Sequence, residues 1–275
     1  MAVMEINMKK TVLVLMLVLC AAVVFASGAK ESGVDNSLEY IKGKGNLILG
    51  LDDSFPPMGY RDENNEIVGF DIDVAKEVCK RLGVKLVLQP IDWNAKEQEL
   101  ATKQIDCIWN GFTVTEERKK SLTFSDAYVN NAQVLIVLND SAYKTLDDLK
   151  GKTVGLQAGS SASDALDDSP AFKASLKGVI ELKDNLTALM DLQAGGCDAV
   201  LMDLLVANYA IKQSAKPMRI LDEGLANEEY AVGFRLGEKA LADAVTKAMK
   251  DMAADGTMAK IATQWFGADI TVIGK

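Results

Sequence analysis

Histidine is absent from this chain of 275 residues, and there are only four cysteines and five prolines. The lack of histidine excludes Ser-His-Asp and Cys-His nucleophilic sites and most zinc sites. Basic residues are also few, because 30 Lys and Arg face 39 Asp and Glu, giving a net charge of -9. With no basic patch we expect no nucleic-acid partner, and the residues indicate neither a metal nor a cofactor.

The remaining composition is that of a globular protein, with 49% hydrophobic and 25% charged residues. Apolar strand-like segments at 47–51, 86–88 and 105–109 alternate with helical patterns at 71–82 and 94–103. Such alternation predicts an α/β protein with largely parallel sheets. The length allows one large domain or two lobes.

A weak internal repeat favours two similar lobes. A helix, a polar turn and a strand over 100–110 are matched by the same plan over 189–203. In α/β sheets, ligands bind beyond the carboxyl ends of the strands, so polar residues at these ends could share one cleft. Each of them could also be an ordinary loop residue. The polar residues at predicted strand ends are Asp52, Asn110, Gln157, Ser161 and Asp203.

The N-terminus has the pattern of a secretory signal peptide. Lys9 and Lys10 precede an apolar run over 12–26 that ends at Ala26. The run is shorter than the roughly 20 residues that a membrane-spanning helix needs. We therefore predict a signal peptide over 1–26 and a periplasmic or otherwise extracytoplasmic protein.

Two alternatives for this segment stay open. Cys20 could carry a lipid anchor, although Leu19 before it is large for a lipidation signal, and the run could also be a buried N-terminal helix. Residues 27–37 are small and polar, and we expect a flexible tether there. Beyond the predicted signal peptide the chain has three cysteines, Cys79, Cys107 and Cys197. Because three is an odd number, at least one of them is unpaired within the chain, and we expect all three to be small buried hydrophobes.

Arg118 is the most informative single residue. Thr115 is a good helix N-cap, which places Arg118 in the first turn of a predicted helix, where backbone amides favour an anion. The arginine side chain adds a planar fork that matches a carboxylate. The alternative is a surface ion pair, for example with Glu117, and such pairs are common and weak.

Several short motifs carry a resemblance that extends over nearly all of the chain after the signal peptide. They are 69–73 (GFDID), 113–120 (TVTEERKK), 124–128 (FSDAY), 149–155 (LKGKTVG), 197–200 (CDAV), 255–257 (DGT) and 265–267 (WFG). Together, and in this order, they resemble the bacterial extracellular solute-binding proteins of family 3, which serve ABC importers of polar amino acids.

The resemblance implies an α/β fold of two lobes joined by two hinge strands. We expect lobe 1 at 38–132 plus 231–275 and lobe 2 at 133–230. It also implies that a bound amino acid favours the closed form, which a membrane permease of the ABC importer then recognises. We expect a monomer without enzymatic activity.

The resemblance further implies a role for each end of the ligand. Arg118 is implied to bind the α-carboxylate, with help from Thr113 and Ser161. Asp203, in the other lobe, is implied to bind the α-ammonium. This agrees with elementary electrostatics, because a zwitterion removed from water needs a partner for each charge.

The side chain of the ligand is implied to lie between Phe55 and Trp93, near the polar groups of Asp52, Asn110 and Gln157. We therefore expect a polar or cationic amino acid. Phe55 and Trp93 could instead be core residues, and Asp52 could instead cap its own loop.

The chain departs from the family pattern at Trp109-Asn110-Gly111, where other members carry small residues or serines. The departure leaves the contact of the ligand amine near Gly111 to the backbone. Two other functions remain as alternatives: an enzyme similar to cyclohexadienyl dehydratases, which would need an acid or base other than histidine, and a ligand sensor on the same fold.

Overall fold

The computed structural model describes residues 34–275, and the compact unit that carries the fold is Asp35–Lys275. The predicted signal peptide, the alternative lipidation site at Cys20 and most of the predicted tether lie outside the described residues. In the described part of the chain, no helix combines the length and the apolar character needed to cross a bilayer.

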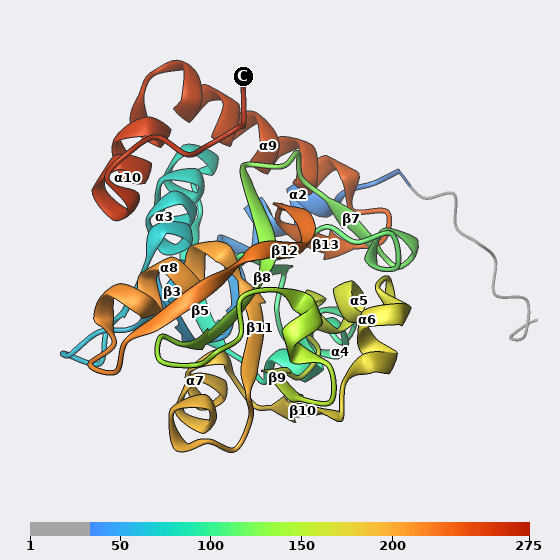
Figure 1. Cartoon of the computed structure of the whole chain (residues 1–275). Coiled ribbons are helices and arrows are strands. Elements are labelled where there is room, and N and C mark those ends of the chain that lie inside the picture. The colour runs from blue at the N-terminus through green and yellow to red at the C-terminus, as the bar shows by residue number, and fades with distance from the viewer. Residues whose placement is uncertain (1–33) are drawn as a thin grey trace, which may run out of the picture. The chain divides into compact units, whose positions relative to one another are not determined.

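Helices and strands alternate along the chain, as the sequence predicts (Figure 1). The helices are α2 (Ser37–Lys44), α3 (Phe70–Leu82), α4 (Lys96–Ala101), α5 (Ser161–Asp167), α6 (Pro170–Ser175), α7 (Asn185–Ala194), α8 (Leu204–Gln213), α9 (Lys239–Ala254) and α10 (Thr257–Phe266), with 3₁₀ turns η1 (Trp93–Ala95), η2 (Arg118–Lys120) and η3 (Leu146–Leu149). The strands are β1 (Asn46–Leu51), β2 (Ser54–Phe55), β3 (Gly59–Arg61), β4 (Ile67–Val68), β5 (Lys85–Pro90), β6 (Cys107–Ile108), β7 (Leu122–Phe124), β8 (Val129–Leu138), β9 (Thr153–Gln157), β10 (Gly178–Leu182), β11 (Ala199–Asp203), β12 (Met218–Tyr230) and β13 (Gly233–Arg235).

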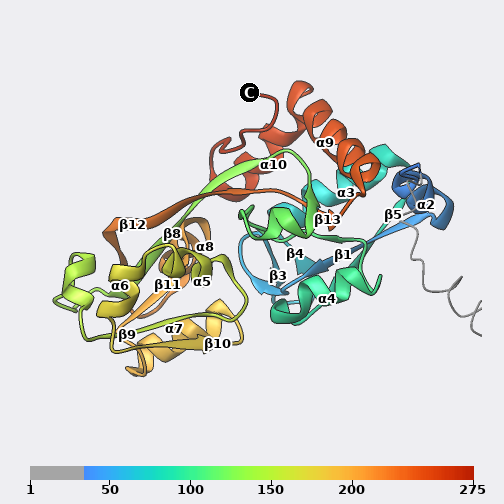
Figure 2. The same cartoon turned by 90° about the vertical axis from the view of Figure 1, so that its right-hand side faces the viewer.

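Two five-stranded sheets organise two lobes (Figure 2). The sheet of the first lobe has the strand order β5-β1-β6-β13-β7, and that of the second lobe has the order β10-β9-β11-β8-β12. In each sheet the first three strands pair in parallel, and the fourth strand, β13 or β8, runs antiparallel to both of its neighbours. Four of the five strands of each sheet therefore point in the same direction, as the sequence predicts, and one strand in each sheet runs the opposite way.

The internal repeat in the sequence corresponds to a repeat in topology. Among the three parallel strands of each lobe, the one that comes first in sequence lies between the other two, as β5-β1-β6 and β10-β9-β11. The carboxyl ends of β1 and β6 precede Asp52 and Asn110, and those of β9 and β11 carry Gln157 and Asp203. The polar strand ends of the two lobes are thus equivalent positions in the two sheets.

The strands β8 and β12 run together between the lobes (Figure 2) and pair antiparallel from Val129↔Tyr230 to Leu138↔Met218. Isolated bridges tie the start of this ladder to the first lobe, since Thr113 pairs with Tyr230 and Val129 pairs with Thr271. These are the two hinge strands of the predicted fold. Sequence reasoning recognised only parts of them, because their polar residues interrupt the apolar pattern.

The N-terminal end of the described chain is fixed to the first lobe. Helix α2 begins at Ser37, whose hydroxyl accepts a hydrogen bond from the Leu241 amide at 3.0 Å. The Asp35 carboxylate accepts from the amides of Ser37 and Ala240. The segment predicted as a tether therefore overlaps the folded unit from Asp35 onward.

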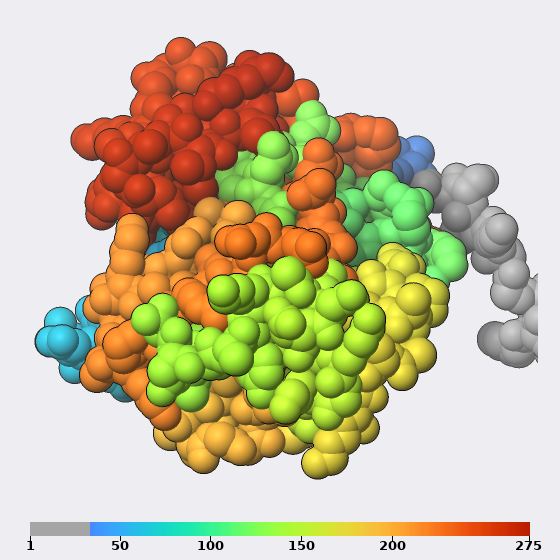
Figure 3. Space-filling model, viewed as in Figure 1, coloured from blue at the N-terminus to red at the C-terminus, as the bar shows by residue number. Residues whose placement is uncertain are grey.

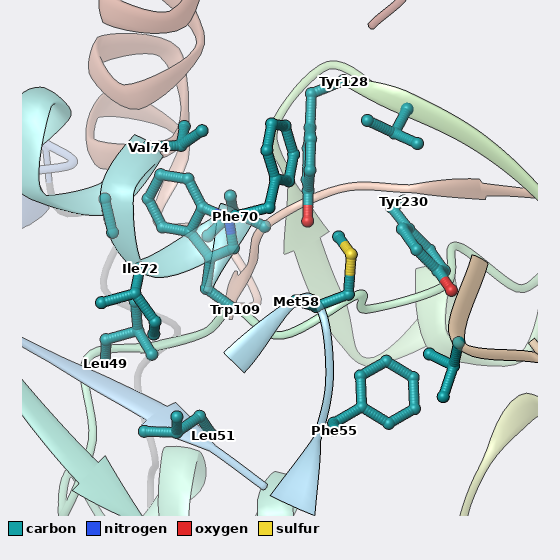
Figure 4. Packing of buried hydrophobic residues seen from close by; sticks show 14 of the residues in the cluster. Leu49, Leu51, Phe55, Met58, Phe70, Ile72, Val74, Trp109, Tyr128 and Tyr230 are labelled. Carbon is teal, nitrogen blue, oxygen red and sulfur yellow. The ribbon is translucent and has the colours of Figure 1, made fainter. Parts of the chain in front are cut away.

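Buried hydrophobic residues of the first lobe, among them Phe70, Trp109 and Tyr128, pack together (Figure 4). Phe70 at the start of α3 stacks on Tyr128 with ring centroids 6.3 Å apart, and Trp109 also packs on Tyr128. Trp109 is fully buried, so the unusual residue of the Trp-Asn-Gly segment anchors the loop that follows it.

The three cysteines of the described chain are all free and buried, as predicted. Burial raises the pKa of the Cys79 and Cys197 thiols to about 12, and it raises the pKa of the Cys107 thiol well above its ordinary value. Because the thiolate is the reactive form, these residues act as small hydrophobic side chains.

Candidate binding site

A narrow cavity, with about 10 Å³ of space for water-sized molecules, lies between the two lobes. Every predicted site residue lines it except Asp52 and Asn110, and Ser160 is an additional member. The lining residues are Phe55, Trp93, Gly111, Thr113 and Arg118 from the first lobe and Gln157, Ser160, Ser161 and Asp203 from the second.

Arg118 is held in the cavity wall by its own loop. Its backbone amide donates to the Thr115 hydroxyl at 3.2 Å, so the predicted cap forms. The predicted helix does not, because only the 3₁₀ turn Arg118–Lys120 follows, and the argument from a helix dipole at Arg118 is wrong. The guanidinium instead donates to the carbonyl oxygens of Thr113 at 2.8 Å and Gly159 at 3.4 Å.

The charge of Arg118 is buried, since only 7% of the residue is exposed. Burial lowers the pKa of the guanidinium, while Asp164 and Glu97 oppose that shift. Among the side chains that the structure describes, its ion-pair contact is with Glu97, with Nε to Oε1 at 4.0 Å. The alternative of a surface pair with Glu117 is wrong, because Glu117 pairs with Lys120.

Asp203 places an anion in the cavity from the second lobe. It ends β11 and is 4% exposed, and its Oδ1 accepts hydrogen bonds from Asn131 Nδ2 and Tyr230 Oη, each at 2.7 Å. Burial, with the nearby Glu228 carboxylate, raises the pKa of Asp203 to about 7. The site thus presents a buried cation on one lobe and a buried, titratable anion on the other.

The hydroxyl groups of Thr113 and Ser161 connect the lobes. Ser161, at the start of α5, donates from Oγ to Thr113 Oγ1 at 3.1 Å. Both residues line the cavity beside Arg118. Ser160 differs from its neighbour, because its hydroxyl donates to the Gln157 carbonyl at 2.7 Å and closes its own turn.

Two aromatic rings form the apolar walls of the cavity. Phe55 lies close to Tyr230 (Figure 4), and Trp93 packs edge-on against Phe112. Phe55 and Trp93 are 5% and 8% exposed, so each belongs to the hydrophobic core and to the cavity lining at once. The binding and core interpretations of these residues are therefore compatible.

Gly111 is required by its backbone and by its neighbours. Its φ is +56°, and a Cβ atom there would lie 2.8 Å from Phe55 Cε1 and 3.2 Å from the Tyr230 ring. Its amide donates to Asp71 Oδ2 at 2.6 Å, and burial raises the pKa of Asp71 to about 7. A ligand ammonium group has only donors, so at Gly111 it could bond only to the carbonyl oxygen.

Asp52 and Gln157 connect the lobes at the other end of the site. Gln157 Nε2 donates to Asp52 Oδ2 at 2.7 Å, and Asn185 Nδ2 donates to Gln157 Oε1 at 3.2 Å. Asp52 Oδ1 accepts from the backbone and hydroxyl of Ser54, so Asp52 also caps its loop. Asn110 Oδ1 accepts from the Asp52 amide at 3.2 Å, which turns Asn110 toward the loop.

Comparison with known proteins assigns the chain to a family. The family model of the bacterial extracellular solute-binding proteins, family 3, matches residues 47–268. The chain belongs to this family. The order of its motifs, the two-lobed fold and the charged cavity between the lobes all agree with that membership.

Individual relatives cover almost the whole chain. The L-cystine-binding protein TcyJ of Escherichia coli (strain K12) is 33% identical over 261 residues, which are 94% of this chain and 96% of the relative. The arginine-binding extracellular protein ArtP of Bacillus subtilis (strain 168) is 31% identical over 262 residues, or 94% and 98%. A substrate-binding protein of an ABC uptake transporter from Streptococcus pneumoniae, solved with bound histidine, has a TM-score of 0.84 at 34% identity, covering 86% of this chain and 98% of that one.

Sequence reasoning missed several residues of this family member's site. Asn131 and Gln133 on β8 bond to Asp203, Ser161 and Glu228, and their spacing of two along a strand could have indicated one shared face. No sequence pattern marked Glu228, because Glu229 follows it directly. Only the tertiary structure shows which of these two carboxylates bonds to residues of the site.

Lys96 was also missed. Its ammonium donates across the lobes to the Gly159 carbonyl at 2.7 Å. Burial, with the nearby Arg118 charge, lowers the pKa of Lys96 to about 8. A lysine at the start of α4 has the appearance of a solvent-exposed helix residue in the sequence, and no pattern marks it as buried.

Proposed function

We propose that this solute-binding protein captures a polar or cationic amino acid between its lobes and delivers it to the membrane permease of an ABC importer. One observation carries the proposal: the buried guanidinium of Arg118 bonds to carbonyl oxygens, with Glu97 at 4.0 Å as its ion-pair contact in the described chain. A buried cation is costly unless it is paired, so a ligand carboxylate is the partner that the site favours.

In this proposal the cavity residues divide by the part of the ligand that they meet. Arg118, Thr113 and Ser161 bind the α-carboxylate, and Asp203 binds the α-ammonium. Phe55 and Trp93 hold the side chain between them. Because Arg118 and Asp203 belong to different lobes, the two charges of one zwitterion would draw the lobes together, and the closed population would rise with ligand.

The class of side chain follows from the polar groups that surround the cavity. Gln157 and Gly111 line the cavity, and Asp52 and Asn110 stand behind this lining, where Asp52 bonds to both Gln157 and Asn110. A hollow next to the cavity shares Thr113 and Ser161 with it, and six of its seven charged residues are acidic. The surfaces of the segments 113–120 (green) and 161–168 (yellow), which contribute to it, lie side by side in Figure 3. The charged residues of the hollow are Glu116, Glu117, Lys120, Asp164, Asp167, Asp168 and Glu228. An excess of carboxylates attracts cationic ligands during encounter.

The proposal includes the organisation and the export of the chain. Lobe 1 would comprise 38–132 and 231–275 and lobe 2 would comprise 133–230, acting as a monomer. Residues 1–26 would direct export and be removed, with a lipid anchor at Cys20 as the alternative. N-terminal sequencing and intact mass of the native protein test this: a start near Ser27 supports export with cleavage, and an intact segment 8–26 would contradict it.

The experiment that tests the ligand class is direct. The mature protein is purified under mild conditions, co-purifying small molecules are identified by mass spectrometry, and all common amino acids and cystine are measured by thermal shift and calorimetry. We expect the tightest ligand to be polar or cationic, such as glutamine, arginine, lysine or histidine. A preference for leucine or phenylalanine would show that the assignment of the side-chain end is wrong.

The relatives reported above are named as binding proteins, which supports binding without chemistry. The enzyme alternative is tested by incubating the protein with arogenate, and we expect no formation of phenylalanine.

A further inference from the structure

Glu228 is a carboxylate that the proposed ligand contacts leave unused. It lies on β12, two residues before Tyr230. Its Oε2 accepts a hydrogen bond from Thr113 Oγ1 of the first lobe at 3.0 Å. The same oxygen accepts from Asn131 Nδ2 at 2.9 Å and Gln133 Nε2 at 3.0 Å, both on β8. The carboxylate therefore stands where the hinge strands meet the site, behind Thr113.

This network fixes the directions of two hydroxyl protons. An ionised carboxylate only accepts and a hydroxyl has a single proton, so Thr113 donates its proton to Glu228. The Gln133 amide donates to Ser161 Oγ at 3.2 Å, and Ser161 in turn donates its own proton to Thr113 Oγ1 at 3.1 Å. The hydroxyl protons that a ligand carboxylate would need are thus both directed to partners within the protein.

Glu228 also adds a second negative charge to the site. Asn131 Nδ2 bonds to both Glu228 and Asp203, so the two carboxylates share one amide group. A ligand carboxylate at Arg118 would therefore approach a like charge and would compete with it for the Thr113 proton. Like charges repel most strongly where water is excluded.

We propose that Glu228 is a specificity-determining residue, which weakens recognition of the ligand carboxylate by competing for the Thr113 hydroxyl proton. This inference rests on the proposed function, because it requires the ligand carboxylate to lie at Arg118 and Thr113. An α-carboxamide carries no charge and brings its own N–H donors, so Glu228 penalises it less than it penalises a carboxylate. The wild-type site thus discriminates between an amino acid and its carboxamide less sharply than the Arg118 fork alone would.

The test compares two isosteric variants that remove the same charge from neighbouring positions. Glu228→Gln removes the acceptor charge at Thr113, and Glu229→Gln, at an exposed position on the same strand, is the matched control. Calorimetry measures Kd for L-arginine and L-argininamide, and for the tightest amino acid of the screen and its carboxamide. We expect Glu228→Gln to raise the Kd ratio of carboxamide to acid about tenfold over wild type, the scale of one charged hydrogen bond. We expect Glu229→Gln to leave that ratio within a factor of about two.

A second comparison assigns the effect to the hydroxyl. In a Thr113→Val background, which removes the contested proton, Glu228→Gln is expected to change the ratio by less than about threefold. A change of the Kd ratio in the Thr113→Val background as large as that in the wild-type background would overturn the proposal. The effect of Glu228 on the ratio would then come from its long-range charge alone. An unchanged ratio in Glu228→Gln beside normal wild-type binding would overturn this inference only. Failure of the wild-type protein to bind any amino acid would overturn the proposed function and this inference with it.

Discussion

The two charged ends of the site are built in opposite ways. Arg118 is held by backbone carbonyl oxygens and lies 4.0 Å from the Glu97 carboxylate, whereas Asp203 accepts side-chain donors and has Glu228 nearby. The cation is held by groups that do not titrate, and arginine remains charged at any physiological pH. The anion has a pKa of about 7, raised by burial and by Glu228. The difference predicts one end that is insensitive to pH and one that is sensitive.

Loss of the cation tests the insensitive end and carries the largest expected effect. Arg118→Ala should weaken amino-acid binding by about 3–5 kcal/mol, the scale of a broken buried ion pair, or a few hundredfold to a few thousandfold. Arg118→Lys should also weaken it strongly, because a point charge cannot reproduce the planar fork. Calorimetry measures the loss, and circular dichroism checks that the fold is retained. Binding within a factor of about three of wild type would remove the main support for the amino-acid assignment.

Asp203→Asn tests the sensitive end. The uncharged amide keeps the shape of the side chain but leaves the ligand ammonium without a counter-charge in the second lobe, and we expect a loss of about 100-fold or more. Small-angle scattering with saturating ligand should also show a smaller closed fraction than in wild type. Unchanged affinity together with full closure would mean that the ammonium binds elsewhere.

The pH dependence of binding sharpens the comparison further. The raised pKa of Asp203 means that its contribution to the stability of the empty protein is present below about pH 3.8 and is lost as pH rises through about 7. An ammonium ligand requires the ionised form, so affinity should rise between pH 5 and pH 8, by at most about tenfold per pH unit below 7.

Asp71 and Lys96 also have pKa values near this range, about 7 and about 8, and both are present in the Asp203→Asn variant. That variant is therefore the matched control, and calorimetry should show its affinity to be nearly flat over the same interval. A pH profile that is equally steep in the variant would assign the titration to another group.

Gly111→Ala is expected to have the smallest effect. The positive φ and the 2.8 Å approach to Phe55 should destabilise the folded protein by about 1–2 kcal/mol, measured by urea denaturation. Affinity should fall by less than about tenfold, since both charged ends remain in place. Gly83→Ala provides a comparison, because that glycine also has a positive φ, at the end of α3, but its Cβ would meet open space. We expect a smaller destabilisation there, from the positive φ alone, and no change in affinity.

The sequence was sufficient for the elements that depend on local patterns. Helix α3, the strands that end at or just before Asp52, Gln157 and Asp203, and the Thr115 cap were all predicted, because periodicity and capping are local properties. The places of the antiparallel strands β13 and β8 in the sheets were not predicted, since their pairing with β6 and β11 joins segments that are distant in sequence.

What the sequence by itself determined is the set of groups available to the site: one arginine after a threonine cap, one aspartate at a strand end, and no histidine. What only the tertiary structure decided is the environment of these groups. Asp52 turns into a cap and an interlobe contact, Lys96 becomes buried, and Glu228 differs from Glu229 by its three hydrogen bonds behind Thr113. The physical reason is that charge and hydrogen-bond energies depend on burial and on partners distant in sequence, which no local pattern records.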